Sequence, residues 1–238
     1  MFLVPNLITL SAMACGLVAV TIANETQAFG TAAAFVLLGA ILDSLDGRIA
    51  RMTGTQSEFG VQLDSLSDAI AFGVAPALLM HAFALREFGS IGLAVCCVYA
   101  ACAIVRLARF NVHAADSHDD GPGRFMVGLS VPVSAAILVA LVGIDVTTDV
   151  TLRGTARTLE LAVAMTALGG LMVSTVPFRS FKDLRMDPST LAIMAGIIGA
   201  AIGAWVVWTP AIALAGLLTV YLAQGFIELV RRTVAGDA

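Results

Sequence analysis

Four aspartates lie within 26 residues of a chain that is otherwise poor in charge. Asp43 and Asp46 are three positions apart, and Asp64 and Asp68 are four positions apart. On helices each pair would share one face. Both flanks, residues 31–42 and 69–80, are strongly apolar, and a carboxylate at such a depth costs several kcal/mol unless it is paired or binds a metal. Two facing pairs therefore predict an oxygen-rich site for one or two hard divalent ions such as Mg²⁺ or Mn²⁺.

The composition places this cluster in a membrane protein. The chain has 238 residues, of which 59% are hydrophobic and 13% charged, and its mean hydropathy is +0.94. Soluble domains carry about twice that share of charge. Apolar runs of about 20 residues predict a single all-α domain over 1–238, a polytopic bundle of about eight transmembrane helices. We expect these helices at 5–23, 29–50, 64–84, 89–109, 125–145, 159–177, 190–207 and 210–230.

The basic residues predict the orientation of the bundle. If both termini lie in the cytoplasm, ten of the 13 arginines and lysines fall in inner segments and three in outer loops. Cytoplasmic loops carry such an excess. We therefore expect an integral protein of the inner membrane with the aspartates at the cytoplasmic ends of their helices. The polar segments 106–124 and 178–188 and the start of the chain open on the same side, so one polar chamber can form from distant parts.

An acidic metal site beside arginines, at membrane depth, suits a phosphorylated substrate with a lipid part. Bound metal ions can bridge a pyrophosphate and neutralise the charge that moves onto a leaving group. Arg51, two helical turns past Asp43, is placed to hold a phosphate oxygen with two N–H donors. The small residues Gly47 and Ala50 let a nucleotide or a neighbouring backbone come close. Asp68 lies deepest along its helix and is the natural acceptor for an alcohol proton.

The same stretch resembles the signature of the CDP-alcohol phosphotransferase family, D-x2-D-G-x2-A-R-x8-G-x3-D-x3-D, at each of its fixed positions. The resemblance implies that Asp43 and Asp64 bridge two metal ions, while Asp46 completes one and Asp68 the other. It also implies that Asp68 is the general base. The residues that it implies as contacts of CDP-diacylglycerol are Asn6, Thr9, Asp43, Gly47, Arg51, Ser57 and Gly60.

Other segments resemble the branch of the family that uses serine as the acceptor: PNLITL, FGVQLDSLSDAIAFGVAPA, RLARFNV, FMVGLSVPVSAA and STVPFRSFKD. This resemblance implies that the serine hydroxyl attacks the lipid-side phosphorus of CDP-diacylglycerol and that CMP leaves. It further implies a homodimer in contact with membrane lipid, with no nucleic-acid partner. Ser130 departs from the proline that we expect in the branch. Candidates for binding the serine carboxylate or a phosphate are Arg106, Arg109, Arg124 and Lys182, although an inner position alone explains such cations equally well.

Two alternatives remain open on the sequence. A sibling enzyme would use glycerol 3-phosphate or inositol phosphate as acceptor, or an archaeal-type lipid as donor, with the same four aspartates. An ion-coupled transporter would use the aspartates as an ion site, which predicts charged groups near the middle of the membrane and a path open to each face in turn. The aspartates gather at one end and the two halves of the chain show no symmetry, so the enzyme is the favoured interpretation.

Overall fold

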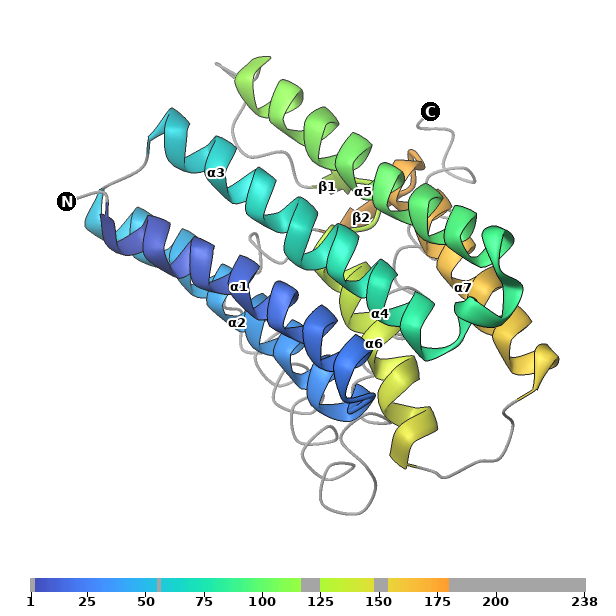
Figure 1. The fold of residues 1–238 in the computed structure, drawn as a ribbon. Coiled ribbons are helices and arrows are strands. Elements are labelled where there is room, and N and C mark those ends of the chain that lie inside the picture. The colour runs from blue at the N-terminus through green and yellow to red at the C-terminus, as the bar shows by residue number, and fades with distance from the viewer. Residues whose placement is uncertain (1–2, 55–56, 117–124, 148–153, 180–238) are drawn as a thin grey trace, which may run out of the picture.

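Long helices form nearly all of the structure, as Figure 1 shows. This computed structural model describes residues 3–54, 57–116, 125–147 and 154–179. Residues 58–83 form one continuous helix that contains a π-helical turn, because α3, η1 and α4 follow one another without a break. The elements are α1 (Leu3–Glu25), α2 (Phe29–Thr53), α3 (Glu58–Asp68), the π turn η1 (Ala69–Val74), α4 (Ala75–Phe83), the 3₁₀ turn η2 (Leu85–Phe88), α5 (Ser90–Asp116), β1 (Phe125–Val127), α6 (Val131–Thr147), α7 (Thr155–Val173) and β2 (Pro177–Arg179).

The helices have the length and composition of membrane spans. Among the described residues, five are long and apolar enough to cross a bilayer: Pro5–Glu25, Phe29–Gly47, Glu58–Phe83, Ser90–Val112 and Thr155–Val173. Val131–Thr147 is a shorter apolar helix. The chain is thus an integral, all-α membrane protein, as predicted. Six of the eight predicted spans correspond to these helices, and the last two, 190–207 and 210–230, lie outside the described residues.

The predicted helix at 125–145 is wrong at its beginning. Phe125–Val127 form strand β1, which pairs antiparallel with β2, Phe125 opposite Arg179. Gly128 ends the strand with a φ of +81°, a conformation that glycine adopts without strain. Helix α6 then begins, and the carbonyl of Ser130 accepts its first backbone hydrogen bond, from Ser134. Serine is a favoured residue at this N-terminal position, so the departure from proline leaves the helix start intact.

Small residues bring α1 close to both helices that carry aspartates. A Cβ on Gly16 would lie 2.9 Å from the Cα of Ala71 in the π turn. A Cβ on Gly39 of α2 would lie 3.1 Å from the carbonyl oxygen of Ala12. Small residues at such crossings let membrane helices pack backbone to backbone. Helix α1 therefore sets the separation of α2 from the helix of residues 58–83.

The π turn begins directly after Asp68. Its defining hydrogen bond runs from the backbone N–H of Ala75 to the carbonyl of Ile70, five residues back. The Phe72 carbonyl accepts from the hydroxyl of Tyr99 on α5 at 3.4 Å, and the Ser134 hydroxyl lies 3.0 Å from the same Tyr99 oxygen. A carbonyl can only accept, so Tyr99 donates to Phe72 and receives the hydrogen bond from Ser134. π turns in helices often accompany functional sites.

Candidate metal and substrate site

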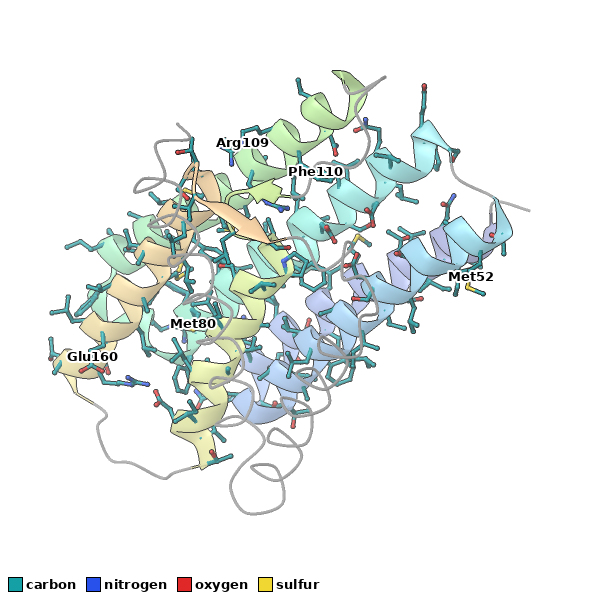
Figure 2. The ribbon with its side chains drawn as sticks, turned by 180° about the vertical axis from the view of Figure 1, so that it is seen from behind. Met52, Met80, Arg109, Phe110 and Glu160 are labelled. Carbon is teal, nitrogen blue, oxygen red and sulfur yellow. The ribbon has the colours of Figure 1, made fainter. Side chains whose placement is uncertain are left out.

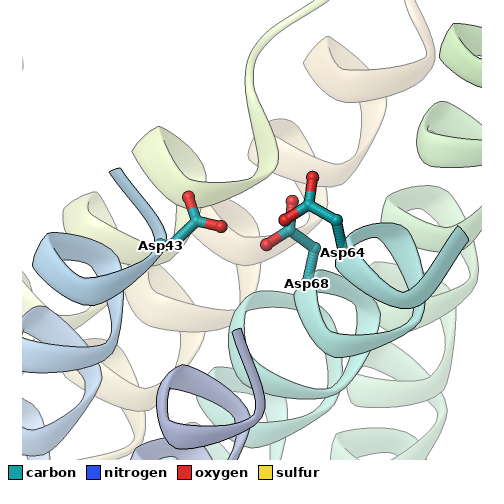
Figure 3. A group of neighbouring side chains, drawn as sticks. All are labelled: Asp43, Asp64 and Asp68. Atoms are coloured by element: carbon teal, nitrogen blue, oxygen red, sulfur yellow. The ribbon is translucent and has the colours of Figure 1, made fainter. Parts of the chain in front are cut away.

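Three of the four aspartates form one group between α2 and α3. Carboxylate oxygens of Asp43, Asp64 and Asp68 all lie within 4.8 Å of one another. Figure 3 shows the three side chains directed toward a common space, Asp43 from one helix and the other two from the facing helix. All three are half-buried. Carboxylate oxygens at this spacing fit a hard divalent cation, which takes oxygen ligands.

Asp46 has a different environment from the other three. Its side chain is 4% exposed, and its Oδ2 accepts a hydrogen bond of 2.5 Å from the Thr9 hydroxyl of α1. A carboxylate has about four lone-pair sites, so this hydrogen bond does not by itself exclude a metal ion. The metal-binding function of Asp46 therefore stays a prediction. The hydroxyl of Thr9, predicted beside the nucleotide, is directed to Asp46 and to the Pro5 carbonyl of its own helix. Thr9 and Asp46 are 37 residues apart, and no local pattern indicates that they pair.

Three predicted substrate contacts lie together at the start of α3. Ser57 is the N-cap of this helix, and its Oγ accepts from the backbone N–H of Gly60 at 3.0 Å. The hydroxyl hydrogen of Ser57 is left to donate to another acceptor. A Cβ on Gly60 would lie 3.8 Å from Oδ1 of Asn6 on α1. Beside Gly47 of α2, a Cβ would meet nothing within 4 Å, so this side of α2 is open to a ligand.

Two of the predicted basic residues, Arg106 and Arg109, have different environments. Arg106 of α5 is 5% exposed, and its guanidinium carbon lies 5.7 Å from the centroid of the Phe110 ring. Arg109 instead lies beside the end of α7 (Figure 2). It donates to the carbonyls of Met172, Val173 and Ser174 at 3.3, 2.9 and 3.2 Å, the way a basic side chain caps a helix C-terminus. The predicted residues outside the described part are Arg124, Lys182 and the side chain of Arg51.

Two polar groups near the carboxylates were not predicted from the sequence. The amide of Asn111 on α5 donates to Oγ of Ser65, which is adjacent to Asp64, at 2.9 Å. Ser67, adjacent to Asp68, is 3% exposed, and its hydroxyl has no hydrogen-bond partner among the described residues. The polar residues of LDSLSD and RLARFNV, two segments on helices that are otherwise apolar, are the signal that could have identified them, since buried polar groups are normally paired.

The sequence of this chain matches a known protein family. A family model described as CDP-alcohol phosphatidyltransferase matches residues 2–221. The chain therefore belongs to the CDP-alcohol phosphatidyltransferase family, whose members transfer a phosphatidyl group from CDP-diacylglycerol to an alcohol.

Several individual proteins of known name are similar to this chain. A CDP-diacylglycerol–serine O-phosphatidyltransferase of Helicobacter pylori is 37% identical over 187 residues, which cover 79% of this chain and 76% of that protein. The protein of the same name from Bacillus subtilis is 30% identical, covering 75% of this chain and 91% of that protein. An archaetidylserine synthase of Methanothermobacter thermautotrophicus is 33% identical, covering 73% of this chain and 68% of that protein.

Proposed function

We propose that this enzyme transfers the phosphatidyl group of CDP-diacylglycerol to the hydroxyl of L-serine, giving phosphatidylserine and CMP. The observation that carries the chemistry is the group of Asp43, Asp64 and Asp68, brought together from two membrane helices. The choice of acceptor is supported by the relatives described above, whose names all specify a serine product or substrate.

We assign two divalent ions, Mg²⁺ or Mn²⁺, to the four aspartates. Asp43 and Asp64 would bridge the ions, while Asp46 and Asp68 would each complete one. Bound ions would supply neutralisation of the charge on the pyrophosphate and on the departing CMP. The carboxylates can hold such ions because they are half-buried and close together, whereas Asp46 would be aimed by its hydrogen bond from Thr9.

Asp68 is assigned as the general base. It takes the proton from serine Oγ while that oxygen bonds to the lipid-side phosphorus. The bond between this phosphorus and the bridging oxygen breaks, and its electron pair leaves with CMP. We favour direct transfer over a covalent intermediate because the group consists of carboxylates and contains no stronger nucleophile. Asp68 lies one turn further along its helix than Asp64, at the end of α3 directly before the π turn, which is consistent with its assignment as the deeper aspartate of that helix.

The substrates would lie on either side of this group. We place the CDP part of the donor along α1, α2 and the start of α3, where Asn6, Ser57 and Gly60 gather and where Gly47 is open. Arg51 would hold a phosphate oxygen. The serine carboxylate is assigned to Arg106, Arg124 or Lys182. Arg109 is less suited to this task since its guanidinium already donates to three carbonyls.

The site would face the cytoplasm from the inner membrane, in a homodimer. Support for this orientation comes from the excess of arginine and lysine on the same side as the aspartates. The donor is a lipid and serine is water-soluble, so a site at the end of the helices can be reached from both phases.

CMP release by the purified full-length protein tests this function. CDP-diacylglycerol would be supplied with serine, glycerol 3-phosphate or inositol phosphate, each with and without Mn²⁺ or Mg²⁺. Metal-dependent release with serine alone is the expected result. Release with a phosphorylated alcohol instead would keep the aspartate chemistry and overturn the acceptor. An archaeal-type CDP-lipid, tested in parallel, would identify the donor, and no release with any pair would contradict the assignment as a transferase.

A further inference from the structure

The helix that carries Asp64 and Asp68 is supported on two opposite sides. Among the other helices, α1 packs most closely against α3, and Gly60 faces Asn6 there. At about 100° per residue, Ser65 lies about 140° around the helix from Gly60, on the far side. Asp64 and Asp68 fall between these two directions, at about 40° and 80°. Contacts at Gly60 and at Ser65 together therefore determine where the two carboxylates point.

The contact on the far side is a single side-chain pair. Asn111 Nδ2 donates to Ser65 Oγ at 2.9 Å, Ser65 Oγ donates back to Asn111 Oδ1 at 3.1 Å, and both residues are half-buried. Two residues before Asn111, the side chain of Arg109 donates to the last carbonyls of α7. A Cβ on Gly128 would lie 2.8 Å from Nη2 of Arg109, so the glycine leaves room for this arginine. The end of α5 is thereby attached to α7, and Asn111 extends from an anchored element to α3.

We propose that Asn111 is a positioning residue, which fixes the rotation of α3 through Ser65 and so keeps Asp64 and Asp68 directed at Asp43. This inference rests on the proposed metal-dependent function. Side-chain atoms lie about 5–6 Å from a helix axis, so a rotation of about 5° moves a carboxylate oxygen by about 0.5 Å. That is the tolerance within which a functional site must be held. The hydrogen bonds of this one side-chain pair are therefore enough to matter.

Mn²⁺ binding measured without substrate tests the proposal. Full-length protein in detergent would be titrated with Mn²⁺, and the free ion followed by electron paramagnetic resonance. We expect Ser65→Ala and Asn111→Leu each to weaken binding about tenfold or more, as loss of a partner behind a metal ligand does. The double variant should be no weaker than the single ones, because each single substitution already removes both hydrogen bonds of the pair. Ser65→Thr, which keeps the hydroxyl, should bind like the wild type.

A second set of measurements separates positioning of the carboxylates from serine binding and from a loss of folding stability. The KM for serine at saturating Mn²⁺ should be unchanged in Asn111→Leu, and so should the melting temperature of the metal-free protein. The matched control is Thr158→Val, which removes a buried hydrogen bond to Glu87 at the other end of the bundle and should leave Mn²⁺ binding unchanged.

Three outcomes would overturn the proposal. Unchanged Mn²⁺ affinity in both Ser65→Ala and Asn111→Leu would show that the pair does not position the carboxylates. A raised KM for serine with normal Mn²⁺ binding would make Asn111 a substrate-binding residue instead. Failure of the wild type itself to bind Mn²⁺ would overturn the metal site of the proposed function, and this inference with it.

Discussion

At the scale of single residues, burial distinguishes Asp46 from the other three aspartates. Asp46 is nearly inaccessible and is hydrogen-bonded by Thr9, whereas Asp43, Asp64 and Asp68 are half-buried and share one space. Sequence spacing predicted that Asp64 and Asp68 share one face, because a four-residue interval on a helix has a fixed geometry. The expected pairing of Asp46 with Asp43 is not seen, since Asp46 lies outside the group of three carboxylates. Sequence spacing could not predict the Thr9–Asp46 contact, which depends on how closely α1 and α2 pack through Gly39.

Replacing Asp68 with asparagine tests the assignment of the base. Asp68→Asn keeps one oxygen but cannot accept the serine proton, and general-base catalysis contributes about 10²–10⁴-fold in rate. We expect turnover to fall by at least about 10²-fold while CDP-diacylglycerol binding is largely retained. CMP release and donor binding would both be measured, with Ser67→Ala as a neighbouring control. Wild-type turnover in Asp68→Asn would remove this residue as the base.

Asp43 is expected to matter for binding as well as for rate. It is the one member of the three-carboxylate group that α2 supplies, so its loss would leave α3 carboxylates without a facing ligand. We expect Asp43→Ala to abolish metal-dependent nucleotide binding. Equilibrium binding of CDP-diacylglycerol with and without Mn²⁺ would show this, and tight metal-dependent binding in the variant would refute the bridging assignment.

Thr9 offers a test of how Asp46 is oriented. A hydrogen bond to a charged group contributes about 1.5–3 kcal/mol, and Thr9→Val removes the donor at nearly constant volume. We expect the variant to need a higher Mn²⁺ concentration for half-maximal CMP release, by about tenfold. Thr9→Ser keeps the hydroxyl and should resemble the wild type. Equal Mn²⁺ requirements in both variants would show that Asp46 needs no support from α1.

At the scale of elements, hydropathy located the helices and missed the irregular turns. The predicted spans at 29–50 and 89–109 correspond to α2 and α5, since long apolar runs in lipid have few alternatives to helix. The strand at Phe125–Val127 was missed because its apolar residues also suit a helix. The π turn at Ala69–Val74 was missed because AIAFGV is an ordinary helical sequence. The extra residue in this turn depends on contacts with α5 and α6.

Tyr99 is the residue through which those contacts act. Its hydroxyl satisfies the Phe72 carbonyl and receives the Ser134 hydroxyl, and all three residues are fully buried. Tyr99→Phe leaves these groups without a partner, which costs about 1–3 kcal/mol each. We expect a lower melting temperature in detergent. Thr166→Val, whose hydroxyl bonds only within its own helix, is the control, and equal melting temperatures in the two variants would contradict the network's contribution.

At the scale of the whole molecule, the aspartates lie at one end of the bundle. The C-terminal end of α6 and the N-terminal end of α7 lie at the opposite end. Gly30, near the start of α2, faces Val146 near the end of α6. Asp43 and Asp46 lie toward the other end of α2, so this helix runs from the end of α6 to the site. Family membership and the fold agree on an integral membrane enzyme, and the side that the site faces follows from charge distribution alone.

That orientation can be tested with two exposed threonines, one at each end. Thr53 lies at the end of α2 beyond the aspartates, and Thr147 at the end of α6. If the positive-inside distribution sets the topology, a membrane-impermeant maleimide should label Thr147→Cys in intact spheroplasts and Thr53→Cys only in inside-out vesicles. The unmodified protein is the control for its four native cysteines. The reverse pattern would place the carboxylates on the outer face, where cytoplasmic serine and CDP-diacylglycerol could not reach them, and would contradict the proposed function through its topology rather than its chemistry.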